Sequence, residues 1–250
     1  MANRLLEQAF ELWIIPEVEA RRAAGRLPDD FQLNMAQRIQ RPDGTNLTRL
    51  NDEVRGLMQV GPIPGAAIGD DAYLDQITSI HSFDLIDEDL DSGHCTVIRL
   101  NGRWFTSFNF LTHRARCLDL LDKAKQFLKA AQDSIARGHS AVAVDTLFSA
   151  CELVSKAELV SSHMLKMDSK SHGQIASSLN NWRKLGNIEG AFVDLFNRLG
   201  QLRPRYRYDA VFSELTPISS DDLDLVDAMI QDGIAKVSPH RPRDRSESVD

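Results

Sequence analysis

Apolar and polar positions follow two different periods, one in each half of the chain. Residues 4–24 place large apolar side chains on one side of a predicted amphipathic helix, which Pro16 would kink or restart. Alternating apolar positions over 31–39 then predict a strand, and Gly44 turns the chain toward a second strand-like run. The first half is therefore predicted to be a mixed α+β module over 1–110.

The strongest local signal is a hairpin sequence near the end of this module. Asn101-Gly102 lies between two strand-like runs, and this pair is favoured in two-residue turns whose central residues both have positive φ. Side chains alternate across a strand, so the returning strand should present two different faces. One face would carry Trp104, Thr106 and Phe108, and the other Phe105, Ser107 and Asn109.

After Phe110 the apolar positions take the period of a helix. Five helices are predicted, over about 114–138, 140–165, 173–186, 188–203 and 219–237. Ser140 is a candidate cap of the second helix, and Ser219 or Ser220 of the last. The overall prediction is an α+β fold whose second part, residues 111–237, is an all-α bundle, followed by a disordered tail over 238–250.

Composition limits the function classes. The net charge of -7 argues against a protein whose whole surface coats nucleic acid, although a local basic site stays compatible with it. The start of the chain lacks the order of a signal peptide, and no apolar run of about 18 residues predicts a membrane span. Cys95, Cys117 and Cys151 are odd in number and form no CxxC pair, which favours reduced thiols in a cytoplasmic protein.

No cofactor or metal is predicted. The glycines form no phosphate-binding loop of either common type. The acidic run over 70–94 includes His81 and His94, but it shows neither HxxxH nor EF-hand spacing. Its carboxylates could instead dock against a basic part of the chain and mask it.

That basic part is the stretch LRPRYRYDA at 202–210. Arginines can contact phosphates and tyrosines can stack on bases, so the stretch predicts a nucleic-acid-binding site. The same composition also suits a helix C-terminus, where cations complement the helix dipole and tyrosines close a core. Both interpretations remain open for the candidate residues Arg198, Arg203, Arg205, Tyr206, Arg207 and Tyr208.

The helical half resembles the HEPN family, the "higher eukaryotes and prokaryotes nucleotide-binding" domain. The likeness covers roughly 113–237 and lies in the order of the segments: a helix, a Gly, an Ala-rich helix ending near Lys156-Ala157, and His172 at the start of a third helix. The last carrier is LFNRLGQLRPRYRYDA, residues 195–210. The resemblance implies a helical bundle that dimerises through this domain.

The resemblance also implies a site that this sequence matches only in part. In active members an arginine, usually followed by a polar residue, precedes a histidine by five or six positions, and the pair cleaves RNA without a metal ion. Arg203 matches the arginine, but Pro204 replaces the polar residue, and Tyr208 and Asp209 stand where the histidine belongs. Pro204 predicts that the helix ends near Leu202 and that a new turn begins at 204.

Three functions are compatible with these observations. The leading hypothesis is a non-catalytic or degenerate HEPN-type binding and assembly module in bacterial antiviral defence or a toxin–antitoxin system, with RNA or a nucleotide as candidate ligand. The first alternative is a metal-independent endoribonuclease that uses Arg203 or Arg207, with Tyr208 or His172 replacing the missing histidine. The second is a scaffold subunit that recruits a separate effector protein.

Overall fold

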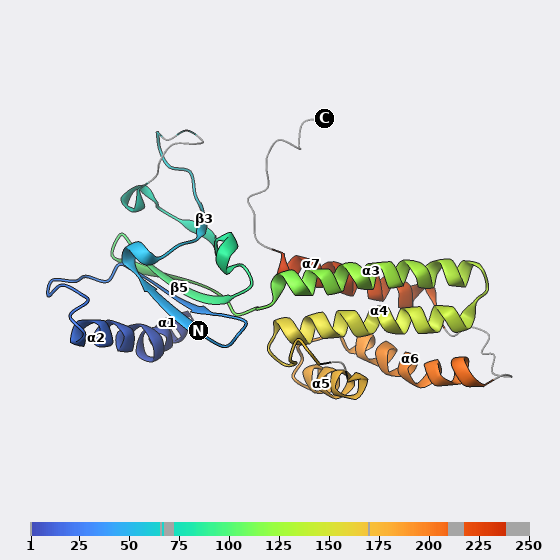
Figure 1. Cartoon of the computed structure of the whole chain (residues 1–250). Coiled ribbons are helices and arrows are strands. Elements are labelled where there is room, and N and C mark those ends of the chain that lie inside the picture. The colour runs from blue at the N-terminus through green and yellow to red at the C-terminus, as the bar shows by residue number, and fades with distance from the viewer. Residues whose placement is uncertain (1, 66, 68–72, 170, 210–217, 239–250) are drawn as a thin grey trace. The chain divides into compact units, whose positions relative to one another are not determined.

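The computed structural model describes residues 2–65, 67, 73–169, 171–209 and 218–238 (Figure 1). The chain divides into two compact units, Met1–Thr112 and His113–Ser238. The first unit holds the strands and the second is helical, so the predicted α+β class is confirmed. The tail predicted over 238–250 lies outside the described residues, apart from Ser238.

The described residues of the first unit form two antiparallel sheets. The larger one has four strands in the order β2-β1-β5-β6, and the smaller pairs β3 with β4. Short 3-10 turns follow β2, precede β4 and precede β5. The strands are β1 Met35–Gln40, β2 Asn46–Leu50, β3 Leu57–Val60, β4 Ile80–Asp84, β5 Gly93–Leu100 and β6 Arg103–Asn109, and the 3-10 turns are η2 Asn51–Glu53, η3 Leu74–Gln76 and η4 Asp87–Asp89.

The Asn-Gly hairpin is confirmed. Asn101 and Gly102 have φ of 48° and 76°, and Leu100 pairs with Arg103 across the two-residue turn. Trp104 packs against the N-terminal helices, while Phe105 joins the apolar cluster shared with the smaller sheet. The two faces of β6 therefore serve two different layers, as the alternation of side chains requires.

The predicted N-terminal helix forms with an irregular turn in its middle. It consists of α1 Ala2–Ala9, the π-turn η1 Phe10–Ile14 and α2 Ile15–Ala23. Pro16 has no N–H to offer to the carbonyl one turn earlier, and the ladder widens just before it, where the Ile15 N–H donates to the Phe10 carbonyl. The widened turn aims Phe10 at Trp104, whose ring centroid lies 5.0 Å away in an edge-to-face arrangement.

Five helices form the described part of the second unit, as predicted. They are α3 Arg114–Ala136, α4 Ser140–Ser161, α5 His172–Lys184, α6 Gly190–Tyr208 and α7 Ser220–Val237. Helix α4 is apolar around most of its circumference because α3, α5, α6 and α7 all pack against it. Figure 1 shows α3 and α4 running side by side along most of their length.

Of the two helix caps predicted from the sequence, one is absent and the other is present. Ser140 is not a cap: it is the first helical residue, and His139 precedes it without a capping side-chain bond. Ser219 does cap α7, because its Oγ accepts from the Asp222 N–H at 3.2 Å. The Asp222 carboxylate accepts from the Ser219 N–H at 2.8 Å, which completes a reciprocal capping box.

The predicted helix end near Leu202 is wrong. Helix α6 continues through Pro204 to Tyr208. A proline inside a helix costs about 3 kcal/mol. This turn is held by contacts on both sides of the proline, since Leu202 is buried in the helical core and Tyr206 packs against it. Tertiary packing therefore overrides the local preference of Pro204.

Candidate functional site

Asp145 of α4 binds two arginines of the basic stretch. Its Oδ1 accepts from Arg203 Nε at 2.5 Å and its Oδ2 from Arg207 Nη2 at 2.9 Å. Arg203 also lies over the Phe148 ring, with its guanidinium carbon 4.9 Å from the ring centroid. Burial opposes ionisation of Asp145, but the bonds from Arg203 and Arg207 outweigh it and hold the pKa of the carboxyl below its ordinary value.

His172 reaches the same aromatic ring from another helix. It is the first residue of α5, and its ring centroid lies 6.2 Å from that of Phe148. Its Nδ1 is hydrogen-bonded to Oε1 of Glu152, one of the other polar residues of α4. The Glu152 carboxylate fixes the orientation of the imidazole, and Nε2 lies on the side of the ring away from this bond. The fold thus brings His172 and Arg203, which are far apart in sequence, against the same Phe148 ring.

Arg198 belongs to a different part of α6. Its Nη2 donates to Asp222 Oδ1 of α7 at 2.6 Å. Burial raises and the bonds from Arg198 and Ser219 lower the pKa of Asp222, and the net direction is downward. Arg198 therefore braces α6 against the capped start of α7, and it does not share the carboxylate of Asp145.

The remaining candidates lie at the exposed end of α6. Tyr208 is among them, and 78% of this residue is exposed. Arg205 is also exposed, whereas Tyr206 is partly buried against the helical core. The predicted set of six residues is therefore divided between a carboxylate-bound pair, a brace to α7, a core contact and an exposed helix end.

The sequence interpretation missed Asp145, Phe148 and Glu152. Their spacing of three and four positions places them on one face of α4. The available signal was chemical: Asp145 and Glu152 are two of the few charged residues in a helix made mostly of apolar and small residues. Such acids need a partner when the helix is surrounded by others, and here Arg203 and His172 supply it.

Lowering the pH is expected to weaken the Asp145 contact. The pKa of this carboxyl is lowered by folding from 3.8, so its stabilisation is present above about pH 4 and is lost as the pH falls through the folded pKa. Asp145→Asn should lower the free energy of unfolding by about 1 kcal/mol at pH 7. This value lies between those typical of exposed salt bridges and of buried hydrogen bonds to charged groups. In thermal unfolding measured from pH 7 to pH 3, the midpoint temperatures of the parent protein and Asp145→Asn should become closer as the pH falls. A constant difference in midpoint temperature across that pH range would contradict the stabilising role assigned to the ionised Asp145 carboxylate.

This site is not accompanied by a metal centre in the described part of the chain. No group of three His, Cys, Asp or Glu side chains lies close enough to hold a metal ion among those residues. In the acidic run, His94 is buried with its Nδ1 3.0 Å from Thr96 Oγ1, and Asp89 pairs with Arg49 at 2.8 Å. None of the helices described is both long and apolar enough to pass through a membrane.

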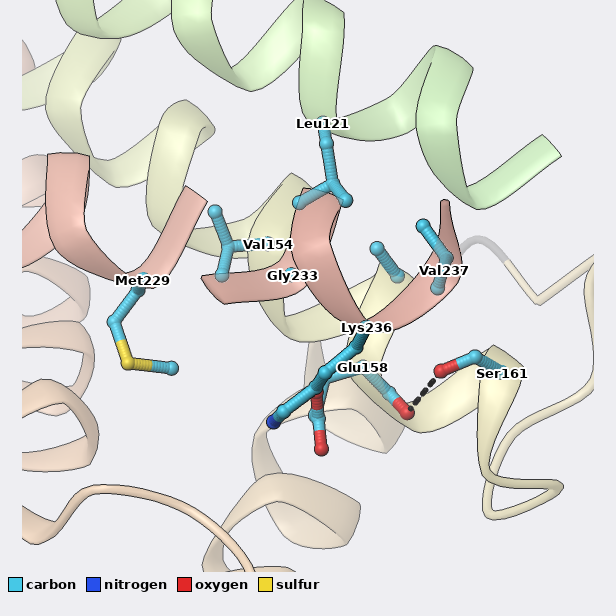
Figure 2. Close-up of a pocket in the computed structure, with 9 residues that line it drawn as sticks. Leu121, Val154, Glu158, Ser161, Met229, Gly233, Lys236 and Val237 are labelled. Carbon is cyan, nitrogen blue, oxygen red and sulfur yellow. Dashed lines mark hydrogen bonds and ion pairs between the residues drawn. The ribbon is translucent and has the colours of Figure 1, made fainter. Parts of the chain in front are cut away.

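The pocket in Figure 2 is a packing feature of α3, α4 and α7. It holds only about 10 Å³, roughly the room of one water. Gly233 lets α7 approach α3, because an added Cβ would lie 3.0 Å from the Leu121 side chain. The Glu158 carboxylate beside it accepts from Lys236 Nζ at 3.2 Å and from Trp182 Nε1 at 3.3 Å. These bonds tie α7 and α5 to α4.

The sequence of the helical unit matches a known class of domain. Residues 117–231, from α3 to α7, match the family model of the HEPN domain. The C-terminal half of the chain is therefore a HEPN domain, as the sequence resemblance indicated. The sheets of the first unit lie outside that match. No curated protein and no solved structure matches the chain.

Proposed function

We propose that this protein is a HEPN-type binding and assembly module without the family's ribonuclease chemistry. One observation carries the proposal: the guanidinium of Arg203, the residue that the sequence resemblance matches to the family's arginine, is held by Asp145 and Phe148, and the side chain five positions later is the exposed Tyr208. A tyrosine has a reference pKa near 10, so it transfers protons poorly at neutral pH compared with histidine.

The ligand that best suits the exposed end of α6 is RNA. Arg207 is partly exposed, and Arg205 and Tyr208 are exposed beside it, which offers positive charge and a stacking surface together. We propose that the domain dimerises and acts in bacterial antiviral defence or a toxin–antitoxin system. In the scaffold alternative, the α+β unit recruits a separate effector protein.

A metal-independent endoribonuclease is the second candidate. It is favoured by the position of His172, whose ring lies against Phe148 as the Arg203 guanidinium does. In this alternative Arg203 would stabilise the charge that develops on the phosphate, and His172 Nε2 would accept a proton. The Glu152 carboxylate would orient the imidazole.

RNA cleavage separates the two candidates. Purified full-length protein, incubated with tRNA and a mixed RNA pool in EDTA, is expected to leave the RNA intact, because no histidine follows Arg203 at the family's spacing. Cleavage that disappears in both Arg203→Ala and His172→Ala would overturn the proposal in favour of the endoribonuclease. Gel electrophoresis of the RNA with time provides the measurement.

RNA binding separates the binding module from a plain scaffold. Arg205→Ala and Tyr208→Ala should each weaken binding of a single-stranded RNA by about 3- to 10-fold, and binding should fall as salt rises. Arg116→Ala, an exposed arginine on α3, is the charge-matched control and should bind like the parent protein. Absence of RNA binding by the parent protein would favour a scaffold subunit.

A further inference from the structure

We propose that Asp145 occupies the position of an RNA phosphate in the Arg203–Arg207 pair and competes with the ligand for both arginines. This inference rests on the proposed RNA-binding function and adds its regulation. Asp145 would set how tightly the site binds, and an incoming phosphate would replace the carboxylate instead of adding beside it.

The geometry of the pair supports this exchange. Each oxygen of Asp145 accepts from a different arginine, so one small anion spans two guanidinium groups. A phosphate also presents two oxygens to such a pair, with additional oxygens left for other donors. Guanidinium groups bind carboxylate and phosphate through the same kind of paired N–H donation, so the same two arginines can hold either anion.

The arginines are held in place before any ligand arrives. Arg203 and Arg207 are four residues apart on α6 and therefore project from the same side of the helix. Arg203 is further restrained by its stacking on Phe148. Binding a ligand usually costs conformational entropy because long side chains become ordered. Here the two arginine side chains are already ordered in the folded protein, so less entropy is lost on binding.

Asp145 is accessible and has no other bond to maintain. Its side chain is 29% exposed, and among the described residues its carboxylate contacts only Arg203 and Arg207. The Asp222 carboxylate differs, because it pairs with Arg198 and also caps α7 through Ser219. Displacing the Asp222 carboxylate would break the capping box at the start of α7, whereas displacing the Asp145 carboxylate would only replace one anion with another.

Asp145→Asn tests the competition directly. We expect it to bind both a twelve-residue oligouridylate and inorganic pyrophosphate about 3- to 10-fold more tightly than the parent protein, by isothermal titration calorimetry. The gain should disappear when Arg203→Ala and Arg207→Ala are added. Asp194→Asn is the control, because it removes the same charge from an exposed pair with Arg183 and should leave both affinities unchanged.

Each outcome has a defined meaning. Equal or weaker binding by Asp145→Asn would overturn the inference and make Asp145 a residue that positions the arginines. Tighter pyrophosphate binding without any RNA binding would support the competition and overturn the proposed RNA function. Binding of neither ligand by either protein would overturn both. Asp145→Ser, a second neutral variant, should give the same gain if the asparagine variant folds poorly.

Discussion

Replacing Phe148 with alanine is expected to lower the free energy of unfolding of the helical unit by about 3–4 kcal/mol. The residue is 6% exposed, and its ring stacks on Phe196 at a centroid separation of 5.3 Å. Arg203 and His172 lie against the same ring. Truncation therefore leaves a cavity and removes the surface on which both polar candidates rest.

Phe148→Leu separates packing from the chemistry of the ring. Leucine keeps much of the apolar volume, so its cost should stay below about 1.5 kcal/mol, although the cation–π contact is lost. Thermal unfolding followed by circular dichroism at the helical band reports mainly the helical unit, since α3–α7 are much longer in total than α1, η1 and α2 of the first unit. A loss below about 1 kcal/mol for Phe148→Ala would contradict the packing assigned to this ring.

Local sequence signals predicted helices, strands and turns well where the conformation depends on neighbouring residues in the sequence. The Asn101-Gly102 turn formed because this pair tolerates positive φ at both positions. The helices of the second half follow from apolar spacing alone. Predictions failed where packing between distant segments decides, as at Pro204, which the core contacts of Leu202 and Tyr206 keep inside α6.

The basic residues of the candidate site could be predicted from the sequence, but their acidic partner could not. The basic stretch and the position of Arg203 could be found from local composition and from the family resemblance. Its acidic partner could not, because Asp145 is 58 residues away and reaches Arg203 through the packing of α4 on α6. The division of the arginines between Asp145 and Asp222 likewise depends on which helices contact α6.

Replacing Arg114 with alanine is expected to destabilise the helical unit by about 3 kcal/mol. Arg114 is the first residue of α3 and is 4% exposed. Its Nε donates to the Val237 carbonyl at 2.9 Å and its Nη2 to the Ser238 carbonyl at 2.8 Å. Carbonyls at a helix C-terminus lack partners in the helix, and a cation there also complements the helix dipole. Arg114 therefore joins the first and last helices of the unit.

The conservative variant Arg114→Lys shows which property of the arginine matters. Lysine keeps the charge but presents a single ammonium group, which cannot reproduce the fork that spans both carbonyls. We expect it to recover less than half of the loss in chemical denaturation. Arg116→Ala, which removes the same charge from an exposed position two residues along α3, should change stability by less than about 0.5 kcal/mol. If Arg114→Ala were as mild as this control, water would have to satisfy the two carbonyls equally well, and the link between α3 and α7 would rest on apolar packing alone.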